Sequence, residues 1–140
     1  MQVLRGVLRA ADHLVHWVGE EFLAVARFVG RREAAPIAEK IRAALAARIF
    51  HLPMAPSSAA PHPLGYAVYP WLPERPRAIG WEEVVDLAGH SLYAAKRGGR
   101  NAWVGVETSP GAEDPQEIVR RFREDPEEAL TSGEMHLVEV

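Results

Sequence analysis

Proline constrains this sequence more than any other residue. Four prolines lie within residues 51–63, and a second proline-rich stretch covers residues 70–80. Because each proline fixes φ and removes a backbone donor, neither stretch can form a long helix or a central strand. Regular structure is therefore expected in residues 1–50, in a short run at residues 64–69, and in residues 81–140.

Three segments have the spacing of apolar residues that is typical of amphipathic helices. Apolar side chains recur every three or four positions from Val3 to Ala11, from Ile37 to Ile49 and from Val84 to Ala95. Pro36 suits the first turn of the second helix, and the third is expected to begin near Trp81. These segments predict three helices.

Five further runs are β-prone: Leu14–Trp17, Phe22–Val29, Leu64–Tyr69, Trp103–Val106 and Met135–Val140. The first two flank Val18-Gly19-Glu20-Glu21, which predicts a hairpin whose tight turn needs a residue that tolerates positive φ. The last run alternates like an edge strand. Asp114-Pro115 predicts one more short helix, because aspartate is a favoured N-cap and proline suits the first helical position.

Composition limits the class of protein. A chain of 140 residues with a net charge of -3 is one modest domain that offers no positive field for nucleic acid or anionic lipid. It has no cysteine and no apolar stretch long enough to cross a membrane, so we expect a cytoplasmic protein with no membrane segment. We expect the tryptophans at positions 71, 81 and 103 to cover the core.

Two short motifs stand about seventy residues apart. The first is Val18-Gly19-Glu20-Glu21-Phe22, and the second, from Leu92 to Asn101, has the sequence LYAAKRGGRN. The first resembles the GG(D/E)EF hairpin of diguanylate cyclases with its leading Gly replaced by Val, and the second resembles the ALYxAKxxGRN helix end of the same GGDEF family. The resemblance covers about residues 3–106, so we assign residues 1–106 to a partial GGDEF domain and residues 107–140 to a C-terminal extension.

The resemblance implies an α/β fold of the α+β, palm-like kind. Members of the family have a twisted five-stranded sheet in the order 2-3-1-4-5, covered by helices. The expected order in this chain, helix-strand-strand-helix-strand-helix-strand, corresponds to the later part of that fold and lacks the central first strand. We therefore expect an incomplete, N-terminally truncated domain. The alternatives for the gap are that another segment fills it, with a second copy or an upstream polypeptide as the candidate source, that the strands on its two sides pair with each other, or that the domain is only marginally folded.

The resemblance also implies a chemistry. Diguanylate cyclases join two GTP molecules into cyclic di-GMP with the help of Mg²⁺. By resemblance, Glu20 is the metal-binding carboxylate, Glu21 is its neighbour in the signature, and Lys96 and Arg100 neutralise the triphosphate. The plainer alternative is that the glutamates are ordinary turn residues and that the two basic residues complement a helix C-terminus.

Several parts of the family's catalytic site have no counterpart. These are a second metal-binding Asp at the end of the first strand and a guanine-reading Asn and Asp after it. Glu20 alone would be a weak anchor for Mg²⁺, and Val18 is expected to resist the positive φ that Gly allows. Gly89 also replaces the Asp that is usual in the family's ADxALY stretch, which overlaps the start of the second motif. We therefore expect the isolated chain to lack cyclase activity.

A second nucleotide site is predicted from a four-residue motif. Arg9-Ala10-Ala11-Asp12 stands five residues before Val18, which is the position of the RxxD inhibitory site of the family. The resemblance implies that Arg9 and Asp12 bind cyclic di-GMP, and some relatives use this site to sense the dinucleotide. A chance RxxD in an arginine-rich helix, and a non-functional remnant of a larger sensor protein, are the alternatives.

Overall fold

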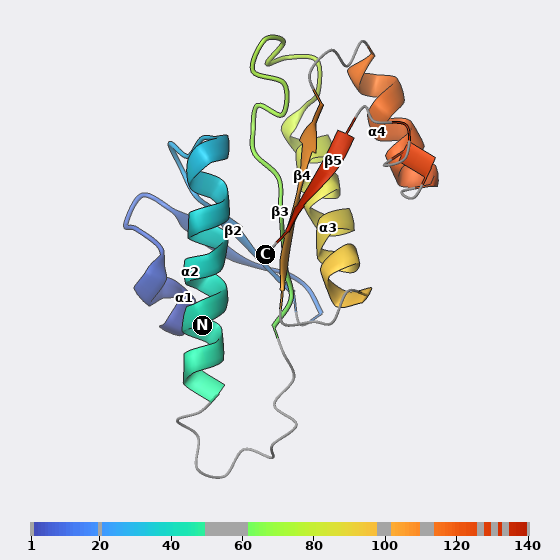
Figure 1. Ribbon diagram of the computed structural model, residues 1–140. Helices are drawn as coiled ribbons and strands as arrows, with labels where there is room; N and C mark the ends of the chain where they lie inside the picture. The colour runs from blue at the N-terminus through green and yellow to red at the C-terminus, as the bar shows by residue number, and fades with distance from the viewer. Residues whose placement is uncertain are drawn as a thin grey trace.

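A computed structural model describes residues 2–19, 21–49, 62–97, 102–109, 114–125, 128–129, 132 and 135–139. Its elements are α1 (Gln2–Val7), β1 (His13–Val18), β2 (Glu21–Val25), α2 (Arg31–Ile49), β3 (Leu64–Tyr66), α3 (Trp81–Arg97), β4 (Trp103–Thr108), α4 (Pro115–Glu124) and β5 (Met135–Glu139). The protein is therefore a mixed α/β structure, and the order of elements up to β4 is the predicted one (Figure 1).

The strands form two separate sheets in the described part of the chain. β1 and β2 make an antiparallel hairpin, whereas the other sheet has the order β3-β4-β5. β3 runs parallel to β4, and β5 runs antiparallel to it at the edge, as the alternation predicted. No strand among the described residues joins the two sheets.

The hairpin is incompletely covered by the rest of the protein. Cross-strand pairing places Val15 beside Leu23 on one face and His16 beside Phe22 on the other. Val15 and Phe22 are both more than two-fifths exposed, so apolar side chains meet solvent on both faces. A two-stranded hairpin alone is marginally stable, and this one depends on its contacts with neighbouring elements.

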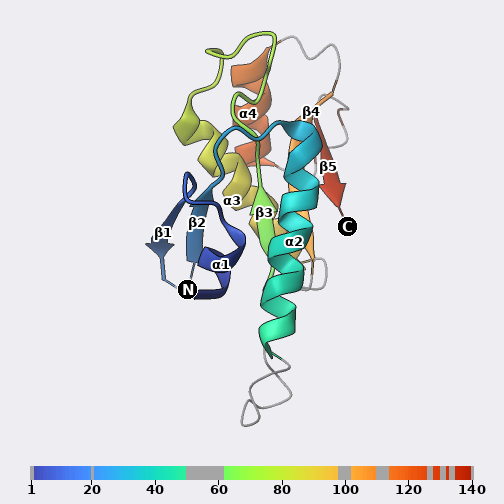
Figure 2. The ribbon, with the colours of Figure 1, turned by 90° about the vertical axis from the view of Figure 1, so that its left-hand side faces the viewer.

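The three-stranded sheet lies between helices. α2 contacts β3 and β4 on one face, α3 contacts the same strands on the other, and α4 packs beside α3 (Figures 1 and 2). β3 approaches α3 very closely at Gly65, where a Cβ atom would lie 2.1 Å from the backbone nitrogen of Leu92. Glycine at this position therefore allows the strand and the helix to touch backbone to backbone.

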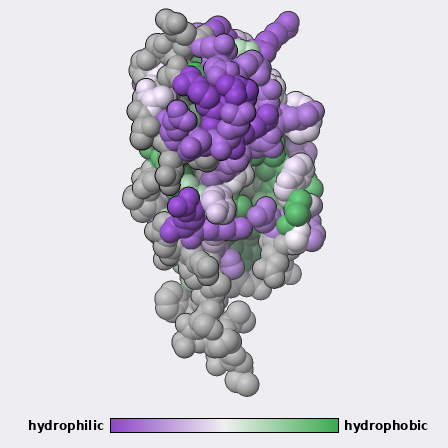
Figure 3. Space-filling view, turned by 90° about the vertical axis from the view of Figure 1, so that its right-hand side faces the viewer, coloured by the Kyte–Doolittle hydropathy of each residue, from purple (hydrophilic) through white to green (hydrophobic). Residues whose placement is uncertain are grey.

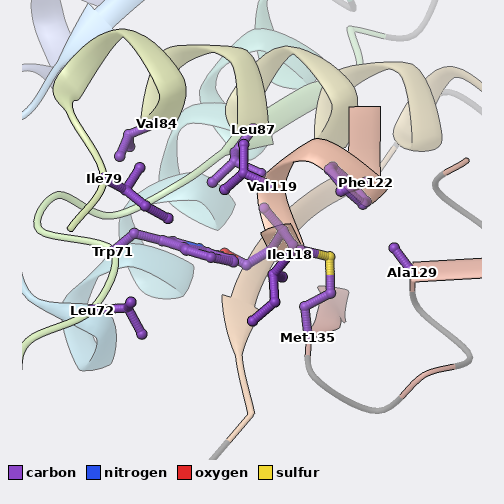
Figure 4. Packing of buried hydrophobic residues seen from close by; sticks show 11 residues of the cluster. Trp71, Leu72, Ile79, Val84, Leu87, Ile118, Val119, Phe122, Ala129 and Met135 are labelled. Carbon is purple, nitrogen blue, oxygen red and sulfur yellow. The ribbon is translucent and has the colours of Figure 1, made fainter. Parts of the chain in front are cut away.

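The main core fills the space between this sheet and helices α3 and α4 (Figure 4). Trp71 is 1% exposed and donates its indole N–H to the carbonyl of Val106 at 3.0 Å. Phe122 of α4 and Met135 of β5 are also buried in it. Segments beyond the region of resemblance thus contribute directly to the core.

On the opposite face, α2 is tied to β4 by a polar contact. The carboxylate of Glu39 accepts two bonds from the guanidinium of Arg42, at 2.9 and 2.6 Å, and one from the indole N–H of Trp103 at 2.9 Å. The bond from Arg42 is the main reason why the pKa of Glu39 falls to about 2. Trp103 is buried, as predicted, because it packs beneath this contact.

The sequence predicted the start of α4 correctly and the start of α2 wrongly. α4 begins as expected, with Asp114 accepting the backbone N–H of Glu117 at 3.2 Å. The prediction for α2 was wrong, because the helix begins at Arg31 and contains Pro36 in its interior. Glu33 accepts the backbone N–H of Gly30 at 3.0 Å, so this reciprocal cap sets the start five residues earlier.

Three other expectations need correction. β2 ends at Val25 and β3 at Tyr66, both earlier than predicted. β2 ends early because the chain turns after it, and Phe28 has a positive φ of 59°. Trp81 is 60% exposed rather than in the core, because it is the first residue of α3 and lies outside the buried stripe of that helix.

Candidate functional site

The two sequence motifs meet in space. Glu21 is the first residue of β2, and Lys96 lies in the last turn of α3. The ammonium group of Lys96 is 3.1 Å from Oε1 of Glu21, although the two residues are 75 positions apart. The other two predicted members of this site, Glu20 and Arg100, lie outside the described residues.

The hairpin turn is built around Gly19. Gly19 has a φ of 55°, the left-handed conformation that glycine adopts without steric cost. A ring nitrogen of His16 lies 2.5 Å from its carbonyl oxygen. Val18 belongs to β1 and pairs with Glu21 after a register shift. The expectation that Val18 opposes a positive φ was therefore wrong, since the turn places that conformation one residue later.

The contact between Lys96 and Glu21 is open to solvent. The side chain of Lys96 is 45% exposed and that of Glu21 is 43% exposed. Exposed ion pairs contribute only about 0–1 kcal/mol to stability, so an incoming anion can replace Glu21 at little cost. Lys96 also stands at the C-terminal end of α3, where a cation is favoured by the helix dipole.

The described residues do not by themselves fit a magnesium site. Mg²⁺ takes near-octahedral oxygen coordination, usually from one or two carboxylates with phosphates and waters. Glu21 is the single carboxylate of the hairpin among the described residues, and it already faces Lys96. No cluster of three His, Asp or Glu side chains that could hold a metal occurs in the part of the chain that the structure describes.

Arg9 and Asp12 come together, and the covered side chain of Asp12 is directed at the backbone of Arg27. The carboxylate of Asp12 accepts the backbone N–H of Arg27 at 2.9 Å and that of Arg9 at 2.8 Å. These bonds, with that of Arg27 the stronger influence, lower the pKa of Asp12. The guanidinium of Arg9 donates to the carbonyl of Arg27. The pair therefore binds both the backbone N–H and the backbone carbonyl of Arg27, and the side chain of Asp12 is only 3% exposed.

An open groove between β1 and α3 was not predicted from the sequence. It has a volume of about 560 Å³, and its lining residues are Trp17, Val85, Asp86, Gly89, His90 and Tyr93. The groove forms because Trp17 of the hairpin and residues of α3 come together in space, and local sequence patterns do not indicate this arrangement. The side of the molecule that carries α3 and α4 is mainly hydrophilic with smaller hydrophobic patches (Figure 3).

No protein-family model, curated protein or solved structure matches this chain. The resemblance to the GGDEF family therefore stays a prediction from the two sequence motifs. In the described residues, no helix is both long and apolar enough to cross a membrane.

Proposed function

We propose that this protein is a GGDEF-related domain that binds the phosphates of GTP or cyclic di-GMP and does not turn them over as an isolated chain. The observation that carries the proposal is the 3.1 Å contact between Lys96 and Glu21. It brings Lys96 of the LYAAKRGGRN motif to the VGEEF hairpin, as a shared nucleotide site requires.

Lys96 supplies the chemistry for binding. A lysine ammonium group has three donors and acts as a point charge for phosphate. Because its present partner is an exposed carboxylate, a phosphate group can displace Glu21 and gain a stronger, doubly charged interaction. Glu21 then competes with the ligand for Lys96, so removing its charge should strengthen binding.

The described residues support phosphate binding better than they support catalysis. A diguanylate cyclase depends on metal charge and on the positioning of two GTP molecules. The described hairpin contributes one carboxylate, and Val18 places two methyl groups at the turn where the family has glycine. We therefore expect no cyclic di-GMP to form from GTP with Mg²⁺ or Mn²⁺. Product formation above that of a Glu20→Ala variant would overturn this part of the proposal.

Cyclic di-GMP binding through Arg9 and Asp12 is the second candidate, and it has less support. Asp12 would have to release the backbone N–H of Arg27, and its side chain is almost fully covered. An RxxD pair that holds the chain between β2 and α2 accounts for the same contacts without a ligand.

The binding proposal is tested by isothermal titration calorimetry with GTP. Lys96→Met should weaken GTP binding by about tenfold, the equivalent of about 1.4 kcal/mol. Lys40→Met is the matched control, because Lys40 is an exposed lysine on another helix, α2. Glu21→Gln should bind GTP at least as tightly as the wild type. No heat at tens of micromolar protein, or equal affinities for the wild type and Lys96→Met, would refute the proposal.

A further inference from the structure

We propose that the outer edge of β1 pairs with β1 of a second copy of this chain, so that the two hairpins form one four-stranded antiparallel sheet. The contact uses only the backbone edge and the side chains of β1. It therefore requires neither Lys96 nor a bound nucleotide, and it is independent of the proposed function.

β1 has a hydrogen-bonding edge that no described strand occupies. β1 and β2 make up the whole of their sheet in the described part of the chain, so β1 has a strand neighbour on one side only. In Figure 2, β1 lies at the outer left of the molecule, with β2 between it and the other sheet. An edge strand presents a row of backbone N–H and C=O groups that can pair with another strand.

β1 also lacks the features by which proteins protect a free edge. These features are charged side chains, above all lysine, together with proline and bulges that turn the edge away. The sequence of β1, HLVHWV, contains no Lys, Arg, Asp, Glu or Pro. Its register shift lies between His16 and Val18, next to the turn, and the residues from His13 to His16 pair with β2 in regular register.

The side chains of β1 are exposed, although most of them are apolar. Five of its six residues are exposed, and Leu14 is partly buried. Val15 is 47% exposed and Trp17 is 50% exposed. A sheet needs three or more strands with a covered apolar face to be stable by itself. A second hairpin supplies both the missing neighbours and a cover for these side chains.

The charge pattern favours a second copy as the partner. In a two-fold symmetric contact, a side chain near the axis meets its own copy, so a charged strand would place like charges opposite each other. With its two histidines neutral, β1 carries no charge, whereas β2 begins with Glu21 and β5 includes Glu139. β3 has only three residues. Among the free edges of the described sheets, β1 is therefore the one best suited to pair with itself.

Antiparallel pairing determines which side chains of the two copies meet. Directly opposite residues lie on the same face of a sheet, so odd-numbered residues of one β1 face odd-numbered residues of the other. The symmetric register that pairs five residues and omits Val18, beyond the register shift, has Val15 on the two-fold axis. Val15 then faces Val15 of the second copy, and Trp17 faces His13. The second copy thereby extends the wall of the groove that Trp17 lines.

Sedimentation velocity without nucleotide tests the dimer, and opposite charges at one position test the interface. Over about 5 to 500 µM, the range suited to a small interface, the wild type should shift from monomer to dimer. Val15→Lys and Val15→Glu should each remain monomeric where the wild type is at least half dimeric. An equimolar mixture of the two should form dimers again, which a folding defect would not allow. Phe28→Lys is the matched control, since Phe28 is 85% exposed and lies outside β1, and it should dimerise like the wild type.

A monomeric wild type up to the highest concentration would overturn the proposal. So would a Val15→Lys variant that dimerises like the wild type, or a mixture that stays monomeric. Failure of GTP to bind would not affect any of these results, because every measurement is made without nucleotide.

A single introduced cysteine tests the register. The chain contains no cysteine, so each new thiol reports only its own copy in the second chain. On mild oxidation, Val15→Cys should form a disulfide-linked dimer, because opposite residues of paired strands bring their Cβ atoms to about 4.5–5.5 Å, close to disulfide distance. Phe28→Cys is the control for chance collisions of an exposed thiol. Cross-linking of Val15→Cys no faster than that of Phe28→Cys would overturn the proposal.

Discussion

Replacing Gly65 with alanine tests the close backbone contact between β3 and α3. Gly65 lies on β3, where it touches α3. The added Cβ would lie 2.1 Å from the backbone nitrogen of Leu92 and 2.5 Å from the carbonyl oxygen of Ala88. Both atoms belong to the helix backbone, which cannot move aside as the end of a flexible side chain can.

The size of the effect follows from these distances. Non-bonded contacts of carbon are optimal at about 3.5–4.0 Å, so α3 has to retreat by roughly 1.5 Å. Overpacking of this kind costs about 1–3 kcal/mol, and we expect the upper part of the range because only backbone atoms are available to yield. For a domain of this length, a loss of about 3 kcal/mol lowers Tm by roughly 10 °C.

Urea unfolding followed by circular dichroism measures this loss. The midpoint should fall while the dependence on urea concentration stays unchanged, because the same surface is exposed on unfolding. Gly89→Ala is the control on the same helix, and it should raise stability by up to about 1 kcal/mol. A Gly65→Ala variant within about 0.5 kcal/mol of the wild type would show that β3 does not pack directly on α3.

Three further substitutions have expected directions. The pKa of Glu39 falls from 4.5 to about 2 beside Arg42, so its charge stabilises the folded state above pH 4.5, and this contribution disappears as the pH falls toward 2. In urea titrations, the stability difference between wild type and Glu39→Gln should therefore shrink over that pH range. A constant difference would contradict the assignment. Phe28 has a φ of 59° and is 85% exposed. Phe28→Asn should therefore raise the free energy of unfolding by about 0.5–1 kcal/mol and move the urea midpoint upward. A lower midpoint would refute backbone strain at this position. The hydroxyl of Tyr66 is buried with no hydrogen-bond partner among the described residues, so Tyr66→Phe should stabilise the protein by about 1 kcal/mol in the same assay, and destabilisation would reveal a partner.

The sequence predicted those elements whose cause is local. Apolar spacing indicated α3, the pair Asp114-Pro115 indicated the start of α4, and Gly19 supplied the turn of the hairpin. The start of α2 was predicted too late because proline is typical of a first helical turn, whereas the cap between Gly30 and Glu33 starts the helix before Pro36. The pairing of β5 with β4 and the burial of Trp71 depend on contacts between distant segments, so local patterns could not specify them.

In the candidate site, too, some features could be predicted from the sequence and others depend on the folded structure. The resemblance of two motifs to one family implied that Lys96 and Glu21 belong to the same site, and their side chains are 3.1 Å apart. The inward orientation of Asp12 could not be foreseen, because it depends on the backbone of Arg27, fifteen positions later. The groove at Gly89 is lined by Trp17 of β1 and by residues of α3, and this arrangement is a property of the folded protein.

The separate hairpin has a thermodynamic consequence. With no neighbouring strand among the described residues and apolar side chains exposed on both faces, it can open locally at a lower free energy than the main core requires for global unfolding. A ligand that contacts both Lys96 and the hairpin would bind the closed arrangement and not the open one. Occupancy would then reduce amide exchange in β1 and β2, so that ligand binding and order of the hairpin become linked equilibria.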